Sequence, residues 1–292
     1  MRRRFATLDV FTDRRFTGNP LAVVLDAGEL DTTAMQAIAR EFGHPETVFV
    51  FAPADAKHRA RVRIFTPARE LQFAGHPTVG TAVLLGLRDG AAAGRELVLE
   101  EGIGPVRCTL EASGSGAGRA RFMLPQLPAE AGSAPDNASI AAALSLAPSD
   151  IGESRPARWS AGNPFTFVPL VTRAAVARCR PNLDKFEAAF GAAGVYVFCR
   201  ETVAPAHQFY ARMFAPGMGV LEDPATGSAA AAFAGLLASS LGDGTHTTVI
   251  EQGYDMGRPS LIHLATTVEA GRLVSAAIGG DAVVVTEGTL EA

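Results

Sequence analysis

Residues 76–82 read "HPTVGTA", and residues 223–229 repeat the pattern as "DPATGSA". Each stretch runs from a titratable residue through proline and two short residues to glycine, a hydroxyl residue and alanine. Proline is favoured in the first turn of a helix, because its missing N–H would have no partner there. Each stretch therefore predicts the start of a helix, and the repetition indicates two copies of one structural unit within the chain.

Two further signatures repeat in the same order. "GNP" occurs at 18–20 and 162–164, and "RIFTP" at 63–67 is matched by "RMFAP" at 212–216. The three spacings are 144, 149 and 147 residues. Signatures in one order at nearly constant spacing predict an internal duplication. Because the period is far longer than that of a solenoid repeat, we expect each copy to be a domain of its own.

A Gly/Ser cluster at 113–118 marks the expected seam between the copies. Two alternating, strand-like runs flank it, "GPVRCTLE" and "RARFMLP". The glycines are misplaced for a dinucleotide fingerprint, and the following residues favour a strand rather than a helix. We interpret the cluster as a loop or linker and predict two domains, 1–118 and 119–292, with the last strand free to pack back on the first half.

The pattern within each copy predicts an α+β fold. In the first copy, "FATLDVF" and "LAVVLDA" are strand-like, and a helix capped by Asp31 or Thr32 ends at Gly43. After two more strands, the helix from Pro77 to about Leu87 is apolar nearly all round and should run through the middle of the domain. The second copy repeats the scheme around a helix over 224–241. Each half is thus predicted to be a sheet wrapped on a central helix.

Composition excludes several classes of protein. Of 292 residues, 48% are hydrophobic and 19% are charged, which indicates a folded globular protein. The net charge of −4 and the scattered basic residues argue against a nucleic-acid partner. Cys108, Cys179 and Cys199 show neither C-x-x-C spacing nor a histidine at ligand distance, so we expect no disulfides and no zinc, as is typical of the cytoplasm. Asp9 interrupts the basic start, which argues against a signal peptide, and the Ala-rich stretch 225–242 is too short for a membrane span.

The two helix starts are candidate ligand sites. The residue before each proline is expected at the N-cap, a position that suits Asp223 and does not suit His76. Gly80 and Gly227 leave the first-turn N–H groups open, and a helix N-terminus carries about half a positive charge. Two such termini facing each other would clamp a carboxylate. At this point Asp223 can equally be a cap and nothing more.

Glu46 is the third candidate. In "FGHPETVFV" it follows the helix stop at Gly43 and a turn at Pro45, and it opens a strand that is otherwise apolar. Taken alone, it is best interpreted as a solvated residue at a strand end.

Four stretches together resemble a known family: "DVFTDRRFTGNPLAVV", "ETVFV", "FTPARELQFAGHPTVGTA" and "EDPATGSAAAA". They are similar to the PhzF-type isomerases of phenazine biosynthesis, within the diaminopimelate epimerase-like superfamily. The resemblance runs along most of the chain. It implies two pseudo-symmetric domains, each a barrel-like mixed sheet around a central helix, with the active site in the cleft between them, and it implies a homodimer.

The resemblance also implies roles for particular residues. Glu46 would be the base and proton shuttle, His76 and Asp223 would orient or protonate the substrate, and Ser228 would hold its acid group. The further binding candidates are the backbones of Gly75 and Gly227 and the paired turn residues Asn19 and Asn163. The implied reaction moves a proton between carbons of a small amino- or hydroxy-carboxylic acid by general acid/base catalysis, as in trans-2,3-dihydro-3-hydroxyanthranilate isomerase. No ligand cluster or phosphate loop occurs in the sequence, so we expect no metal and no other cofactor.

Two alternatives stay open. One is a racemase or epimerase that uses bases other than thiols, since Gly75 and Thr226 stand close to where the superfamily's two-thiol enzymes would carry cysteines. The other is a non-catalytic protein that binds a small carboxylate. The role of Asp223 is open as well: it would need burial or a close carboxylate to act as a proton donor, and otherwise it would receive an amino or hydroxyl group.

Overall fold

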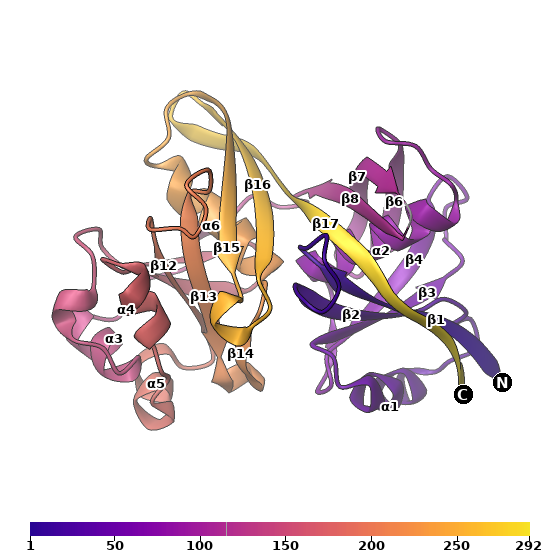
Figure 1. Ribbon diagram of the computed structural model, residues 1–292, viewed down its shortest axis with the longest axis horizontal. Helices are drawn as coiled ribbons and strands as arrows, with labels where there is room; N and C mark the ends of the chain where they lie inside the picture. The colour runs from indigo at the N-terminus through magenta and orange to yellow at the C-terminus, as the bar shows by residue number, and fades with distance from the viewer. Residues whose placement is uncertain (115) are drawn as a thin grey trace. The chain divides into compact units, whose positions relative to one another are not determined.

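The protein divides into two compact units. The structure, a computed structural model, describes residues 1–114 and 116–292. Unit 1 comprises Met1–Pro125 and Ile278–Ala292, and unit 2 comprises Gln126–Ala277. The strand β17 (Arg272–Glu291) carries the chain back from unit 2 into unit 1 (Figure 1).

Unit 1 is a closed barrel of eight strands. Its elements are β1 (Arg2–Val10), β2 (Asn19–Val24), α1 (Thr32–Phe42), β3 (Glu46–Phe51), β4 (Ala60–Phe65), β5 (Glu70–Leu71), α2 (Gly75–Arg88), β6 (Glu96–Glu101), β7 (Gly104–Gly114) and β8 (Ala117–Met123). The strands pair in the order β1, β2, β3, β4, β6, β7, β8 and β17, and β17 pairs with β1 to close the ring. The short β5 pairs with β4.

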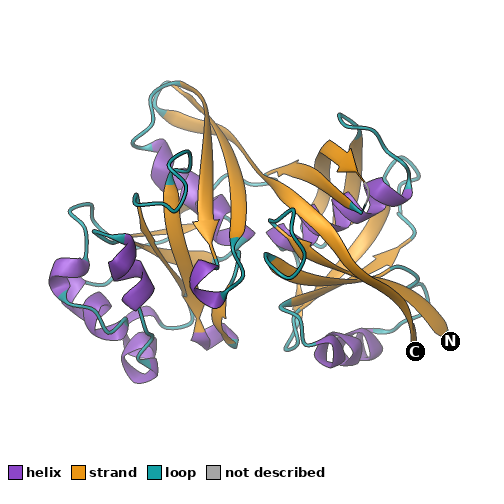
Figure 2. Ribbon diagram, viewed as in Figure 1, coloured by secondary structure: helices purple, strands orange, loops and turns teal. Residues whose placement is uncertain are grey.

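Helix α2 fills the interior of this barrel. Its residues from Gly75 to Gly86 are all buried, and strands surround it (Figure 2). The helix approaches the barrel wall closely at Gly80, where an added Cβ would lie 2.6 Å from Cδ2 of Leu21. The predicted central helix is thereby confirmed. Helix α1 packs on the outside, with Asp31 accepting from the amide of Ala34 at 2.8 Å and Gly43 ending it at φ 63°.

Unit 2 repeats the arrangement. Its elements are β9 (Ala129–Glu130), α3 (Asn137–Ala143), β10 (Ala157–Ser160), β11 (Pro164–Pro169), α4 (Arg173–Arg178), α5 (Leu183–Phe190), β12 (Gly194–Cys199), β13 (Phe209–Ala215), β14 (Val220–Asp223), α6 (Gly227–Ala238), β15 (Gly244–Gln252), β16 (Ser260–Glu269) and three single-turn 3₁₀ helices, at Pro148–Asp150, Pro216–Met218 and Tyr254–Met256. The pairings β10–β11, β11–β12, β12–β13, β13–β15 and β15–β16 alternate between antiparallel and parallel in the same way as β1–β2 through β6–β7.

The helices of unit 2 occupy both faces of its sheet. The apolar helix α6 (Gly227–Ala238) is buried except at Ser228 and Leu236, which are half-buried. Helices α3, α4 and α5 gather on the opposite side (Figure 1), where Ile140, Val176 and Phe186 pack against strands β11 to β13. The α+β fold predicted from the sequence is confirmed, with a sheet around a central helix in each repeat.

The expected linker over 113–118 has a different structure. Strands β7 and β8 form a hairpin there, in which Gly114 pairs with Ala117. Gly116 adopts φ 75°, a conformation that glycine tolerates in a tight turn. Ser115, which falls within the predicted linker, lies outside the described residues. The division between the units falls after Pro125, beyond the predicted position at 118/119.

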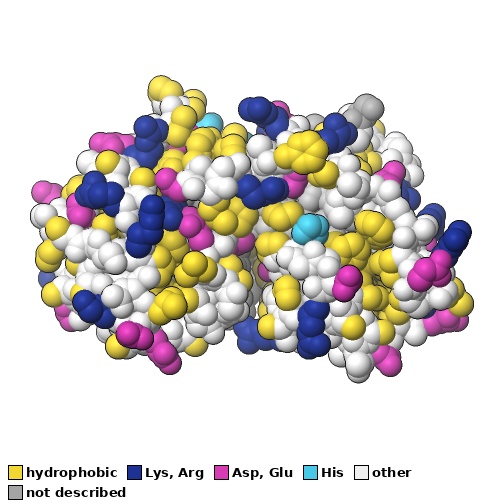
Figure 3. Space-filling model, turned by 60° about the horizontal axis from the view of Figure 1, so that its bottom comes forward, with side chains coloured by type: hydrophobic (Ala, Val, Ile, Leu, Met, Phe, Trp, Pro, Cys, Tyr) yellow, Lys and Arg dark blue, Asp and Glu magenta, His cyan; other side chains and the backbone are white. Residues whose placement is uncertain are grey.

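The surface carries charges of both signs. On the face drawn in Figure 3, Lys and Arg side chains are interspersed with Asp and Glu. Within the described parts of the chain, no helix is both long enough and apolar enough to cross a membrane.

Candidate active site

The first group of candidate residues lies in unit 1, where two parallel strands begin at the same edge. Leu21 of β2 stands opposite Glu46, the first residue of β3. Asn19 and Pro20, at the start of β2, therefore lie beside Glu46. The β2 strand begins here because Gly18 turns the chain at φ 66°, and an added Cβ on this glycine would lie 2.4 Å from the carbonyl oxygen of Val10.

His76, in the first turn of α2, faces this edge. Its imidazole forms a hydrogen bond with the backbone of Pro20. Proline has no N–H, so the ring is the donor. Among the described residues, Nε2 has no hydrogen-bond partner, so the donating atom is Nδ1. The neutral ring therefore presents the lone pair of Nε2 to its other side.

Glu46 lies on that side. Its Oε2 is 3.4 Å from Nε2 of His76, and its side chain is 17% exposed. Burial lowers the pKa of His76 to about 3, outweighing the hydrogen bond to Pro20, and the nearby His44 lowers it further. His76 is thus neutral near pH 7. A carboxyl group facing an imidazole lone pair across a short distance is an arrangement that can pass a proton.

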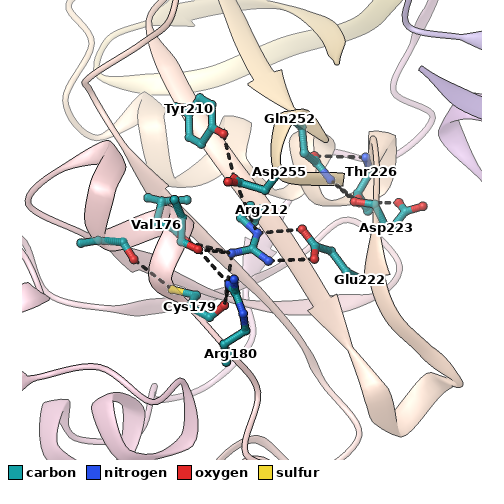
Figure 4. Close-up of polar contacts among 12 residues, drawn as sticks. Val176, Cys179, Arg180, Tyr210, Arg212, Glu222, Asp223, Thr226, Gln252 and Asp255 are labelled. Atoms are coloured by element: carbon teal, nitrogen blue, oxygen red, sulfur yellow. Dashed lines mark hydrogen bonds and ion pairs between the residues drawn. The ribbon is translucent and has the colours of Figure 1, made fainter. Parts of the chain in front are cut away.

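The other candidate residues lie in unit 2, around the start of α6. Asp223 ends β14 and is buried. Its Oδ2 accepts from Oγ1 of Thr226 at 2.5 Å, and its backbone carbonyl accepts from Nε2 of Gln252 at 2.8 Å (Figure 4). Oε1 of Gln252 in turn accepts from the amide of Thr226 at 3.2 Å. Asp223 is held by a hydrogen-bonded set that the sequence analysis did not foresee.

The expectation that Asp223 and His76 are N-caps is wrong. The N-cap of α6 is Thr226, and that of α2 is Ala74. Asp223 stays in the strand because β14 pairs with β13 as far as Met213↔Asp223. Neither cap side chain accepts a hydrogen bond from the helix, so the first-turn amides of α2 and α6 do not donate to a capping side chain.

The remaining candidates differ in exposure. Gly75 and Gly227 are the first residues of α2 and α6, and both are buried. Ser228, the second residue of α6, is half-buried. Asn19 is buried in β2, whereas Asn163 is exposed in the turn before β11.

A buried arginine anchors the strand that carries Asp223. Arg212 of β13 donates to both carboxylate oxygens of Glu222, at 2.7 and 2.8 Å, and to the carbonyl oxygen of Cys179 at 3.1 Å (Figure 4). Unit 1 has the same pair in Arg63 and Glu70, whose two bonds are both 2.6 Å long. The repeated "RIF" and "RMF" stretches supplied the sequence signal for these two arginines.

A further hydroxyl lies close to Asp223. The side chain of Tyr196 is fully buried in β12, and its hydroxyl has no hydrogen-bond partner among the described residues. Burial, and then the charge of Asp223, raises the pKa of Tyr196 far above its usual range. The hydroxyl therefore keeps its proton at every pH at which the protein would be assayed.

The three cysteines are unsuited to acid/base work. Cys108, Cys179 and Cys199 are all buried. Burial raises the pKa of Cys179 to about 12, raises that of Cys199 to about 11, and raises that of Cys108 well above the usual value for a thiol. Near neutral pH all three are thiols, which are poor bases.

Comparison with known proteins agrees with this architecture. The crystal structure of a Bacillus anthracis phenazine biosynthesis protein of the PhzF family superposes with a TM-score of 0.90, at 27% identity and full coverage of both chains. A hydroxyproline epimerase from Agrobacterium vitis shares the fold, with a TM-score of 0.64 at 12% identity, over 99% of this chain and 92% of its own. The fold is thus shared with a protein of the PhzF family and with a hydroxyproline epimerase.

The family follows from the sequence match. Residues 8–288 match the PhzC-PhzF family, described as phenazine biosynthesis-like protein, and the chain belongs to that family. A protein of Mesorhizobium japonicum named as an uncharacterized isomerase is 49% identical over 99% of this chain and 98% of its own. The trans-2,3-dihydro-3-hydroxyanthranilate isomerase of Pseudomonas aeruginosa is 34% identical over 98% of each chain. The protein is an isomerase of PhzF type.

Proposed function

We propose that this isomerase moves a proton between two carbons of a small amino- or hydroxy-carboxylic acid by general acid/base catalysis, with no cofactor. Relatives at 32–34% identity, along 98% of the chain, are named for that type of reaction. The observation that carries the mechanism is the contact of 3.4 Å between Glu46 and a neutral His76.

Glu46 acts as the shuttle in this proposal. It takes a proton from one carbon, the electron pair of the broken C–H bond enters the adjacent double-bond system, and the proton returns to another carbon. Once Glu46 has taken up the proton, its carboxyl group can donate a hydrogen bond to Nε2 of His76, because Nδ1 is already committed to Pro20. No net oxidation or reduction occurs, so the step needs no redox partner.

Asp223 and Ser228 act as binding groups for the same substrate. Asp223 already accepts a hydrogen bond from Thr226, so it is best suited to receive an amino or hydroxyl group. Ser228 and the first-turn amides of α6 hold the carboxylate, since helix N-termini favour anions. Asn19 and Asn163 are secondary binding candidates.

The test is proton exchange with solvent. The purified protein is incubated in heavy water with trans-2,3-dihydro-3-hydroxyanthranilate and, separately, with a panel of small amino and hydroxy acids. Mass spectrometry should detect a product that has gained one deuterium bound to carbon. Inversion of an isolated stereocentre without movement of a double bond would instead establish a racemase.

Two broader expectations complete the proposal. By the same resemblance we propose a homodimer, and light scattering that gives a mass near 30.4 kDa at micromolar concentration would contradict it. Catalysis without a cofactor predicts full activity after dialysis against a chelator. Loss of turnover that is restored by a metal would overturn this part of the proposal.

A further inference from the structure

At the start of α2, one threonine hydroxyl lies within hydrogen-bond distance of two oxygen acceptors, although it has only one proton to donate. Oγ1 of Thr78 lies 2.8 Å from the carbonyl oxygen of Ala74 and 2.8 Å from Oε1 of Glu101. A threonine hydroxyl has a single proton to donate. Both contacts are hydrogen bonds at the same time only if Glu101 is protonated and donates to Thr78, while Thr78 donates to Ala74.

The surroundings of Glu101 favour its neutral form. It is the last residue of β6 and is 7% exposed, and among the described residues its Oε2 has no hydrogen-bond partner. Burial raises the pKa of Glu101 to about 8, although the bond to Thr78 acts in the opposite direction. An ionised carboxylate in this position would have one oxygen buried without a donor, which is costly.

The groups that face Glu101 carry no compensating charge. Cys108, on the inner face of β7, has a pKa raised by burial well above its usual value, so it remains a thiol. His76, two residues before Thr78 in α2, is neutral. The charged side chains of the flanking strands β4 and β7 lie at outer positions of those strands: Arg61, Arg63, Arg107 and Glu111.

Gln252 occupies the same position in the second repeat. The stretches "LEEG" at 99–102 and "IEQG" at 250–253 both end a strand that runs parallel to β4 or β13. In both stretches, the glycine that follows lets the segment before the central helix pack closely against the backbone. A Cβ on Gly102 would lie 2.3 Å from Oε1 of Gln72, and one on Gly253 would lie 2.6 Å from the carbonyl oxygen of Pro224.

The hydrogen bonds of Gln252 show what this position does. Its amide nitrogen Nε2 can only donate, and it contacts Oγ1 of Thr226 at 3.0 Å (Figure 4). Thr226 is therefore free to donate its own proton to Asp223. The chain in unit 2 runs from amide to hydroxyl to carboxylate. The chain in unit 1 runs from carboxyl to hydroxyl to the carbonyl of Ala74.

We propose that Glu101 and Gln252 are equivalent positioning residues, each donating a hydrogen bond to the threonine that orders the start of its central helix, and that Glu101 does so as a neutral carboxylic acid. When Glu101 ionises, Thr78 must turn its proton to the carboxylate and release Ala74. The carbonyl of Ala74 also accepts the first helical bond, from the amide of Thr78 at 3.2 Å. Ionisation thus loosens the turn that carries His76.

The hydrogen-bond chain is tested without a substrate. Wild-type protein and Glu101→Gln, which copies the second repeat, are titrated from pH 6 to 10 while the ¹⁵N resonances of His76 are followed by NMR. We expect the wild-type resonances to shift with a midpoint near pH 8, the pKa of Glu101, and those of Glu101→Gln to stay constant. An identical shift in both proteins, or none in the wild type, would overturn the proposal.

The effect on turnover rests on the proposed function. Wild-type turnover should fall about tenfold from pH 7 to pH 9, because at one unit above its pKa about nine-tenths of a group is ionised. For Glu101→Gln, the ratio of turnover at pH 7 to turnover at pH 9 should stay within about twofold of one.

Glu101→Leu places a buried side chain there that donates no hydrogen bond, so it should lose turnover at both pH values. A Glu101→Leu variant that behaves as Glu101→Gln would contradict the positioning role. Glu41→Gln, an exposed change in α1, should follow the wild-type profile. If no substrate is turned over at all, the proposed function fails, and the NMR titration still decides the inference.

Discussion

The two central helices begin with nearly the same letters and acquire different chemistry. Helix α2 already includes His76 and Pro77, whereas α6 begins only at Gly227 and leaves Asp223 and Pro224 before it. The imidazole is consequently a neutral, buried group at a helix start. The carboxylate is the last residue of a strand. Each repeat contributes one kind of group from one motif.

Strand length accounts for this difference. In unit 1, β5 has two residues and ends at Leu71, well before His76. In unit 2, β14 has four residues and continues to Asp223, and the bond between Arg212 and Glu222 fixes it to β13. Backbone pairing with β13 therefore keeps Asp223 in the strand and out of the first turn of α6. The two repeats share a central helix, and they differ in the length of the strand that precedes it.

The largest effect is expected for Glu46→Gln in unit 1. The change keeps the shape of the side chain and removes the basic oxygen that faces His76. Turnover should fall by about 10²–10⁴-fold or more, since general acid/base catalysis alone supplies about that factor. Turnover and deuterium uptake are measured, with binding followed by calorimetry, and Glu41→Gln is the control. Retention of a tenth of wild-type turnover at unchanged affinity would assign the base to another residue.

The second prediction compares the two arginine–glutamate ion pairs by their exposure and by what their loss should cost in stability. The side chains of Arg212 and Glu222 are 5% and 17% exposed, and those of Arg63 and Glu70 are 28% and 32% exposed. Arg212→Ala leaves a carboxylate buried without its partner and should lower the free energy of unfolding by about 3–5 kcal/mol. Arg63→Ala should cost about 1 kcal/mol or less.

Urea unfolding of both variants at pH 7 measures this contrast. The thermal midpoint of Arg212→Ala should fall by roughly 10 °C, judged from the usual size scaling for a domain of this length. Equal losses in the two variants would mean that the anchoring of β14 is no stronger than that of β5, and the explanation given for the position of Asp223 would then fail.

Much of this structure could be predicted from the sequence, and the reasons are physical. The caps of α1 are local signals, Asp31 before the helix and Gly43 after it, and both were recognised. The central position of α2 was predicted because its sequence is apolar nearly all round, and that of α6 because the second copy repeats the scheme. The duplication predicted that the pattern of strands would recur.

The misses share a cause, which is that they depend on strand pairing and side-chain contacts that the local sequence pattern does not specify. The hairpin at Gly114 and Ala117 resembles a linker because glycine and serine suit both structures. The cap predicted for Asp223 was lost to strand pairing with Met213. Glu101 and Gln252 carry no motif that marks them, although "LEEG" at 99–102 and "IEQG" at 250–253 repeat at a spacing close to that of the other signatures.

The third comparison concerns two histidine–glutamate clamps. In unit 2, Glu251 is fully buried and accepts from His207 at 2.7 Å and from the amides of Val203 and Ala204. In unit 1, Glu100 makes the equivalent bonds to His58, Ala54 and Asp55, with 14% of its side chain exposed. The two clamps hold matching loops before β13 and β4.

His207→Leu should therefore be more harmful than His58→Leu. A hydrogen bond to a buried charged group contributes about 1.5–3 kcal/mol, so the loss at His207 should fall in that range. The change at His58 should produce a smaller shift of the urea midpoint, because water can reach Glu100. A larger loss at His58 would show that these loops, and not burial, decide the outcome.

The smallest loss of activity is expected for the two threonines at the helix starts, Thr226 and Thr78, and the kinetic parameter that changes should differ between them. Thr226→Val keeps the side-chain shape and removes the proton that Asp223 accepts at 2.5 Å. If Asp223 binds an amino or hydroxyl group of the substrate, its misplacement should reduce kcat/KM by about tenfold, equivalent to about 1.4 kcal/mol. The loss should appear mainly in KM, since a binding group acts on substrate and transition state alike. Thr226→Ser restores the hydroxyl and should recover most of the loss.

Thr78→Val, the counterpart in unit 1, removes the bonds to Ala74 and Glu101 instead, so its loss should appear in kcat through His76 and Glu46. Steady-state kinetics of the three variants side by side makes the distinction. Losses in kcat for both valine variants would mean that Asp223 takes part in proton transfer, and the division of labour between the two repeats would have to be redrawn.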